Sequence, residues 1–171
     1  MKLEKFSIAA GIVLILLLAV LIVWQADIVG VSKGGLEKDA RKRQNIENGW
    51  EVAQAVNEDI CAMLFYDTDK ADCTYSIYLT REGMSYGYFF GQGGSDAYMT
   101  EGVKGVIFEN KGIALLSMNH DRVSRIEAGN SEIPVDPEKP FVVVLPIDCG
   151  EITIYDAQEN IVTLYDSYTG I

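Results

Sequence analysis

One uninterrupted apolar run near the amino terminus constrains this chain more than any other feature. From Phe6 to Trp24 the chain has nineteen residues without a charge. A helix of that length, rising ~1.5 Å per residue, roughly matches the ~30 Å hydrocarbon core of a bilayer. Trp24 suits the lipid–water interface, whereas Asp27 is costly in lipid. Because a helix that is apolar all round would need a far larger protein to cover it, we predict a transmembrane helix and not a core helix.

A cleaved signal peptide is the nearest alternative, because the tail Met1–Lys5 contains Lys2 and Lys5. A cleavage site needs small residues, whereas the exit from the apolar run contains the bulky Trp24, and the run is longer than that of a usual signal peptide. We therefore predict an uncleaved signal anchor. The expected organisation is a basic tail over residues 1–5, a transmembrane anchor over 6–26, a polar and partly helical stalk over 27–48, and a soluble domain over 49–171.

The side of the membrane depends on how far from the anchor the basic residues are counted. Next to the anchor only Lys2 and Lys5 count, and they predict a domain outside the cytoplasm. A wider window adds the basic residues between Lys33 and Arg43 on the far side, which would keep the domain in the cytoplasm. We expect the outside, because a short basic tail before a long apolar run is typical of a signal anchor, and large domains translocate largely regardless of charge.

The soluble part of the chain is strongly acidic. The whole chain has 14 basic and 25 acidic residues and a net charge of −11. Taking away Lys2, Lys5 and Glu4, which precede the apolar run, leaves 12 basic and 24 acidic residues and a net charge of −12. Such a domain lacks the positive surface by which proteins hold nucleic acid, so we expect no nucleic-acid partner. The one basic cluster, Arg41-Lys42-Arg43, could touch lipid headgroups but is more typical of a solvated linker.

Three cysteines, Cys61, Cys73 and Cys149, cannot all pair within one chain. If the segments that contain the first two form a hairpin, Cys73 lies opposite Tyr66 and Cys61 lies opposite Tyr78. The two thiols are then ~17 Å apart along the ladder, which is too far for a disulfide. We predict free, buried thiols that behave as small apolar residues, and a bond from Cys149 to one of the others stays open.

Short segments rich in β-branched and aromatic residues, bounded by Gly, Asn, Asp or Pro, are typical of strands and fill most of the remaining chain. They predict a mainly β fold of about eight to ten antiparallel strands, a β-sandwich of the Ig-like or jelly-roll-like kind, with a barrel as the alternative. The segment FVVVL is apolar on both faces and predicts a central strand. The expected strands, after one near Trp50, are Ile60–Tyr66, Thr74–Leu79, Tyr86–Phe90, Val103–Phe108, Ile113–Met118, Val123–Ala128, Phe141–Leu145, Ile152–Tyr155 and Ile161–Tyr165. The expected hairpin turns are Arg81–Gly83, Asn110–Gly112 and Ala157–Asn160.

A cluster of aromatic residues is the main candidate for a binding surface. Alternation along a strand places Tyr86, Tyr88 and Phe90 on one face, with Tyr75 and Tyr78 on the neighbouring strand. An exposed row of these rings would suit stacking on sugars or on an apolar patch of a partner protein. Half-buried tyrosines that pack in the core are the commoner arrangement, and both interpretations stay open.

Three loops contain residues that could form a site, and each lacks part of the required pattern. Asp67, Asp69 and Asp72 share one loop and leave a weak possibility of calcium, but the Gly and the Glu of an EF-hand are missing. The glycine-rich segment 91–95 is not followed by a helix start that could hold a phosphate. His120 lies close in sequence to Ser117 and Asp121, but a catalytic triad brings its members together from separate elements, and the cysteines lack the paired short spacing of a zinc site. We therefore expect no catalytic residue, no metal and no cofactor.

The hypothesis that these patterns favour is a noncatalytic β-domain that is tethered to the lipid bilayer and binds a protein or a glycan. The alternative is a hydrolase with paired carboxylates, which would need two of them in one pocket with one raised pKa. Its candidate residues are Asp67, Asp69, Asp121 and Glu151. A third possibility is an accessory subunit of a membrane complex whose anchor presents Ser7, Ala10 and Gly11 to other helices.

Overall fold

The computed structural model describes residues 12–18, 20–21, 28–83 and 85–169 of the chain. Residues 12–18 and 20–21 are helical, and their large apolar side chains are exposed, from 50% for Leu18 to 67% for Ile15. The rest of the predicted anchor, including residues 6–11 and 22–26, lies outside the described residues. Among the helices of the described residues, none has both the length and the hydropathy to cross a bilayer.

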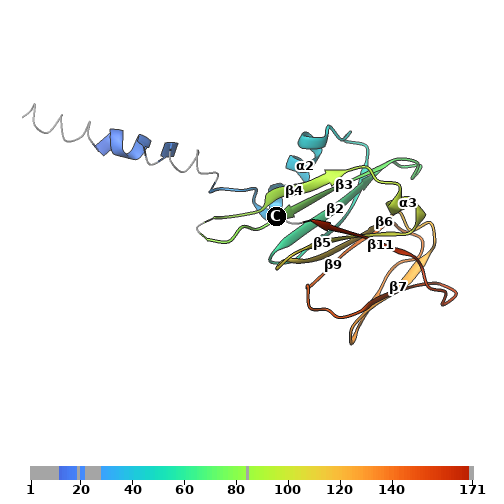
Figure 1. Ribbon diagram of the computed structural model, residues 1–171. Coiled ribbons are helices and arrows are strands. Elements are labelled where there is room, and N and C mark those ends of the chain that lie inside the picture. The colour runs from blue at the N-terminus through green and yellow to red at the C-terminus, as the bar shows by residue number, and fades with distance from the viewer. Residues whose placement is uncertain (1–11, 19, 22–27, 84, 170–171) are drawn as a thin grey trace, which may run out of the picture.

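Three β-sheets pack face to face in the described part of the chain (Figure 1). The strands are β1 (Glu51–Val56), β2 (Ile60–Tyr66), β3 (Cys73–Leu79), β4 (Phe89–Gly94), β5 (Val103–Phe108), β6 (Gly112–Ser117), β7 (Val123–Ala128), β8 (Ser131–Pro134), β9 (Phe141–Leu145), β10 (Ile152–Asp156) and β11 (Leu164–Thr169). Sheet 1 has the order β1-β2-β3-β4, sheet 2 the order β11-β5-β6-β9, and sheet 3 the order β10-β7-β8. The fold is mainly β, as expected, and its strands pair antiparallel except for β11 with β5. Within the described residues the sheets form no closed barrel, which was the alternative.

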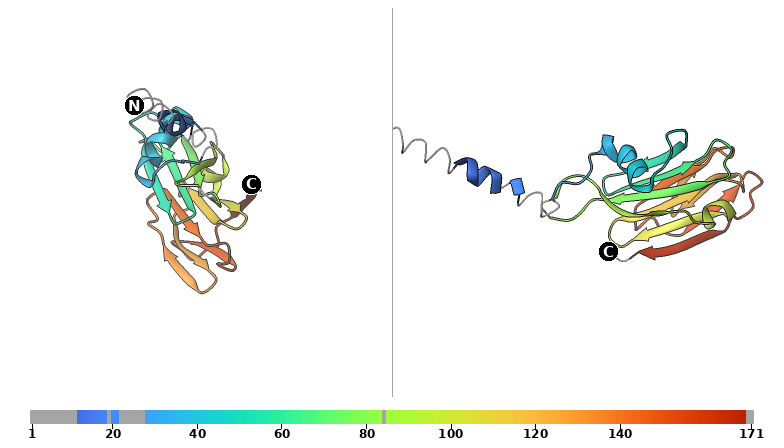
Figure 2. Two further views of the ribbon diagram at one scale, coloured as in Figure 1. Left: turned by 90° about the vertical axis from the view of Figure 1, so that its left-hand side faces the viewer. Right: turned by 90° about the horizontal axis from the view of Figure 1, so that it is seen from above.

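Helix α2 (Leu36–Gln44) covers the face of sheet 1 that is turned away from sheet 2 (Figures 1 and 2). It follows a 3-10 turn, η1 (Lys33–Gly35), and buries Leu36 and Ala40 completely. These two residues are four positions apart and so lie on one side of the helix. The helix expected between residues 27 and 48 therefore packs on the domain. A shorter helix, α3 (Tyr98–Glu101), joins β4 to β5 and buries Met99.

Sheet 2 is the middle layer, and apolar side chains cover both of its faces. Val106 and Phe108 pack toward sheet 1, whereas Leu115 packs toward sheet 3. Strand β9 shows the same division, because Val142 packs in the core between sheets 1 and 2, whereas Val143 packs in the core between sheets 2 and 3. The apolar character of FVVVL on both faces therefore reflects burial between two other sheets.

Four strands have the bounds that the sequence predicts, whereas the others differ in their bounds or are not predicted. β2, β5, β7 and β9 are confirmed at both ends. β9 is an edge strand of sheet 2 and not a central one, β8 was not expected, and β4 begins at Phe89 and not at Tyr86. The predicted hairpin around Ala157–Asn160 keeps only one bridge, from Tyr155 to Ile161. β11 instead pairs with β5 in parallel.

The predicted register of β2 and β3 is confirmed. Tyr66 lies opposite Cys73 and Cys61 lies opposite Tyr78, so the first two cysteines are far apart along the ladder. All three cysteines are free, with Cys61 and Cys73 buried and Cys149 partly exposed. Burial raises the pKa of the Cys61 thiol to about 11, and burial together with nearby aspartates raises that of Cys73 to about 11. Neither thiol is therefore reactive at neutral pH.

Candidate functional site

The five aromatic side chains that the sequence groups together do not form one exposed surface. Tyr75, Tyr78 and Tyr88 are at most 9% exposed and Phe90 is half-buried, whereas Tyr86 is 72% exposed. Tyr75 packs toward sheet 2, and Tyr78 and Tyr88 pack toward α2. The expected exposed row is therefore not formed, and core packing, the other interpretation, applies to all but Tyr86.

The hydroxyl groups of the buried tyrosines bond within the protein. Tyr78 donates to Asp39 Oδ2 at 2.7 Å, and Tyr88 donates to the carbonyl of Asn57 at 2.6 Å. Burial, followed by the bond to Asp39, raises the pKa of Tyr78. These hydroxyls hold α2 and the β1–β2 turn against sheet 1.

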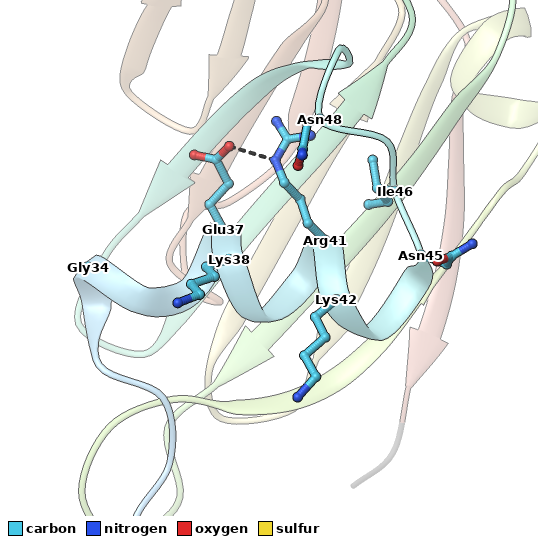
Figure 3. A pocket seen from close by; sticks show the side chains of 8 residues that line it. All are labelled: Gly34, Glu37, Lys38, Arg41, Lys42, Asn45, Ile46 and Asn48. Carbon is cyan, nitrogen blue, oxygen red and sulfur yellow. Dashed lines mark hydrogen bonds and ion pairs between the residues drawn. The ribbon is translucent and has the colours of Figure 1, made fainter.

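A groove of about 570 Å³ lies on the outer side of α2 (Figure 3). It runs along the helix to the turn that follows it. We call it the α2 groove. Its lining residues are Gly34, Glu37, Lys38, Arg41, Lys42, Asn45, Ile46 and Asn48.

Arg41 forms one wall of the α2 groove and has a structural role. Its Nε donates to Glu37 Oε1 at 2.8 Å, and its two terminal nitrogens donate to the carbonyls of Glu47 at 3.0 Å and Trp50 at 2.9 Å. The guanidinium also lies 5.0 Å from the centre of the Phe65 ring. Arg41 thereby fixes the chain between α2 and β1 and uses three of its five N–H donors within the protein.

The side chains of Lys38 and Lys42 differ from that of Arg41. Both are exposed, and neither ammonium group makes a hydrogen bond or a close ion pair within the described part of the chain. They are one helical turn apart and point outward from α2 (Figure 3). Asn45, at the end of the helix, and Asn48, beside Arg41, are also exposed and add amide groups to the groove (Figure 3). The site therefore offers two ammonium donors and two amides, which suits carboxylate groups, and its own carboxylate, on Glu37, accepts the hydrogen bond from Arg41.

The amino-acid sequence indicates this groove only weakly. The basic residues Arg41-Lys42-Arg43 were expected to lie in a solvated linker, but Arg41 bonds to the domain and Arg43 donates to Asp39 Oδ2 at 2.6 Å. The feature of the sequence that could have indicated the groove is the four-residue spacing of Leu36 and Ala40. These two residues mark the buried side of the helix, and Lys38 then lies on the opposite side.

The candidate calcium loop uses its carboxylates to hold its own turn. Asp67 Oδ1 accepts hydrogen bonds from the backbone N–H groups of Ala71 at 2.7 Å and Asp72 at 3.2 Å, and Asp72 Oδ1 accepts from Cys73 N–H at 2.8 Å. Asp69 is exposed at the tip of the turn. Over the described ranges, no three Asp, Glu, His or Cys side chains converge as a metal site would require.

The carboxylates of the hydrolase hypothesis are placed in separate connections. Asp67 and Asp69 lie between β2 and β3, Asp121 between β6 and β7, and Glu151 before β10. None of the four lines the α2 groove or the two smaller cavities, one beside Val29 and the other beside Asp96. His120 is exposed in the same turn as Asp121.

One buried charged group was not predicted. Lys104 is 4% exposed, and its Nζ donates to Asp96 Oδ2 at 2.5 Å and lies 5.6 Å from the centre of the Tyr75 ring. Burial acts to raise the pKa of Asp96, but hydrogen bonds from Lys104 and the Tyr98 N–H outweigh it, so that pKa is lowered. Gln92 Nε2 donates to the Tyr75 hydroxyl at 2.8 Å. The lowered pKa suits a structural ion pair and not a general acid.

The sequence matches none of the protein-family models and none of the curated proteins, and the structure matches none of the solved structures with which it was compared.

Proposed function

We propose that this chain is a membrane-tethered, noncatalytic β-domain that lies outside the cytoplasm and binds a partner protein through the α2 groove. The observation that carries the proposal is the pair of exposed ammonium groups on Lys38 and Lys42, on a chain whose net charge is −11. A partner helix with two carboxylates one turn apart would place one carboxylate near each ammonium group. Ile46 adds a half-buried apolar contact at the end of the groove.

Two observations support the tether: the length of the apolar run, and the helical structure of those of its residues that the structure describes. Residues 12–18 and 20–21 are helical, and nothing in the described domain covers their side chains. A helix that exposes apolar side chains all round requires an apolar environment, which a bilayer provides. We propose that the domain at the end of this anchor is a β-sandwich with an Ig-like or jelly-roll-like topology.

The other functions have less support. Glycan stacking would need the row of exposed tyrosines, of which only Tyr86 is exposed. A hydrolase would need paired carboxylates in one cavity, and Asp67, Asp69, Asp121 and Glu151 line none of the three cavities described above. An accessory role in a membrane complex would need partner helices against the anchor, whose small residues lie outside the described ranges.

A photoreactive amino acid at Asn48 is expected to crosslink the full-length chain to a discrete protein partner in the cells that make it. Asn48 lines the α2 groove and is exposed, so a probe there reaches a bound partner. The double substitution Lys38→Glu/Lys42→Glu is expected to reduce the crosslinked product about tenfold, because two attractions become repulsions. Immunoblotting of the irradiated cells measures the product.

The matched control is Lys70→Glu/Lys139→Glu, which changes the net charge equally at a distance from the groove. Lys70 donates to the Glu138 carbonyl, and Lys139 pairs with Asp136. This control is expected to retain the crosslink. Equal loss in both variants would mean that only overall charge matters, and a product of lipid mass would mean that the groove binds headgroups. Either result would contradict the proposal.

A cysteine placed at Asp69 is expected to react with a membrane-impermeant maleimide in intact cells. Asp69 is exposed in the β2–β3 turn, and Cys149→Ser removes the one partly exposed native thiol. Cys61 and Cys73, with pKa values of about 11, are about one part in a thousand thiolate at pH 8 and contribute little background. Labelling that occurs only after lysis would place the domain in the cytoplasm and overturn this part of the proposal.

A further inference from the structure

Two segments that are distant in the sequence are joined where the chain enters the domain. Residues 28–31 and 85–88 bridge through four backbone hydrogen bonds, and we call them the bridged segments. Gly30 N–H donates to the Tyr86 carbonyl at 2.7 Å, and Tyr86 N–H donates to the Ile28 carbonyl at 2.9 Å. Val31 and Tyr88 exchange both of their bonds, at 2.8 and 2.9 Å. The first described residues after the anchor are thereby fixed to the β3–β4 connection.

Two glycines allow the bridged segments to approach so closely. A Cβ on Gly30 would lie 2.6 Å from the Tyr88 carbonyl oxygen, and one on Gly87 would lie 2.8 Å from the Val31 carbonyl oxygen. Gly87 also has a φ of +89°, which L side chains rarely adopt. This conformation turns the chain between its two neighbouring tyrosines, so Tyr88 points into the protein while Tyr86 points out.

The outward side of the bridged segments presents two large apolar side chains side by side. Val29 is 63% exposed and Tyr86 is 72% exposed, and the two residues are bridge partners. On the inward side, Val31 and Tyr88 pack into the core beneath α2. An exposed valine beside an exposed tyrosine, held on a fixed backbone, is a surface that an apolar partner, either a protein or a membrane, would cover.

The position of this surface in the chain indicates which of these partners covers it. Val29 follows Trp24, the end of the apolar run, by five residues. The β3–β4 connection extends on the side of the domain from which the helical residues 12–18 and 20–21 project (Figures 1 and 2). We infer that Val29 and Tyr86 insert into the lipid–water interface of the bilayer that holds the anchor, an inference that rests on the membrane tether proposed above. Tyrosine is favoured at that interface, with its ring among acyl chains and its hydroxyl among headgroups.

The inference is tested with the full-length chain in phosphatidylcholine vesicles that contain a lipid with a nitroxide near its headgroup. An environment-sensitive fluorophore is attached to Tyr86→Cys in a Cys149→Ser background. Nitroxide lipid is expected to lower its emission by about twofold or more, because a group in the interface lies within quenching range. The matched control is Ile161→Cys, a residue that is also exposed, at 73%, but lies in the connection between β10 and β11. Its emission is expected to stay unchanged.

Flotation of the same vesicles separates this inference from the tether itself. If the chain floats with the lipid and neither fluorophore is quenched, the tether stands and the inference is overturned. If both fluorophores are quenched equally, the domain lies on the lipid without a preferred edge, and the inference is again overturned. A chain that fails to float would overturn the tether, and the inference with it.

Discussion

Replacing Asp96 with asparagine is expected to lower the free energy of unfolding by about 2–3 kcal/mol, because it leaves a buried cation without its counter-charge. The Lys104 side chain is 5% exposed and ion-pairs with Asp96 Oδ2 at 2.5 Å. Asparagine keeps the shape of the side chain and can still accept a hydrogen bond, so the change isolates the charge. Urea unfolding of the full-length chain in nonionic detergent micelles, in a Trp24→Phe background and followed by Trp50 fluorescence, measures the difference.

The matched variant for this prediction is Lys104→Met, which removes the buried charge itself. Asp96 is then unpaired but 26% exposed, so water can solvate it. We expect a loss of about 1 kcal/mol or less, clearly smaller than that of Asp96→Asn. Equal losses for the two variants would show that packing, and not the uncompensated charge, determines the effect.

The ion pair also predicts a pH dependence. Because the folded-state pKa of Asp96 lies below its ordinary value of 3.8, its contribution to stability is fully present above that value. The contribution is lost as the pH falls through the folded-state pKa. Asp96→Asn is therefore expected to lose less stability on acidification than the wild-type chain does.

Replacing Asn119 with alanine is expected to destabilise the fold by about 2–4 kcal/mol, because it leaves buried backbone groups without partners. Asn119 is 5% exposed and lies where the chain passes from β6 in sheet 2 to β7 in sheet 3. Its Oδ1 accepts from Val123 N–H at 2.6 Å. Its Nδ2 donates to the carbonyls of Val123 at 3.2 Å and Asp136 at 2.9 Å.

The control for Asn119→Ala is Asn110→Ala, since both asparagines have a positive φ, 60° and 62°. Asn110 is exposed in the β5–β6 turn, so its replacement tests the backbone conformation alone. We expect it to lose about 1 kcal/mol. Thermal unfolding by circular dichroism compares the two variants, and similar shifts in melting temperature would refute a role for the buried hydrogen bonds.

The features that the sequence predicted are those set by local pattern. The register of β2 and β3 follows from two apolar runs around one turn, and Tyr66 lies opposite Cys73 as expected. The burial of β9 on both faces follows from FVVVL, which has no polar side. Its position at the edge of sheet 2 could not be predicted, because the order of strands depends on contacts between distant segments.

The candidate site was harder to predict, for two physical reasons. Alternation placed Tyr86 and Tyr88 on one face, but the positive φ of Gly87 interrupts the alternation between them. The basic residues near α2 were expected to be solvated, because sequence spacing shows which side of a helix is apolar but not which surface it packs on. Arg41 bonds to the chain before β1 and so holds α2 on the domain, which leaves Lys38 and Lys42 on its outer side.

The parallel pairing of β11 with β5 affects the order in which the protein can be completed during synthesis. β5 ends at Phe108, whereas its partner begins at Leu164, so a nascent chain carries β5 with one unpaired edge while the intervening segment is made. An open strand edge is a template for pairing with other chains. Translational pausing or truncation between these two strands is therefore expected to favour aggregation more than a similar interruption after sheet 1, whose four strands are contiguous.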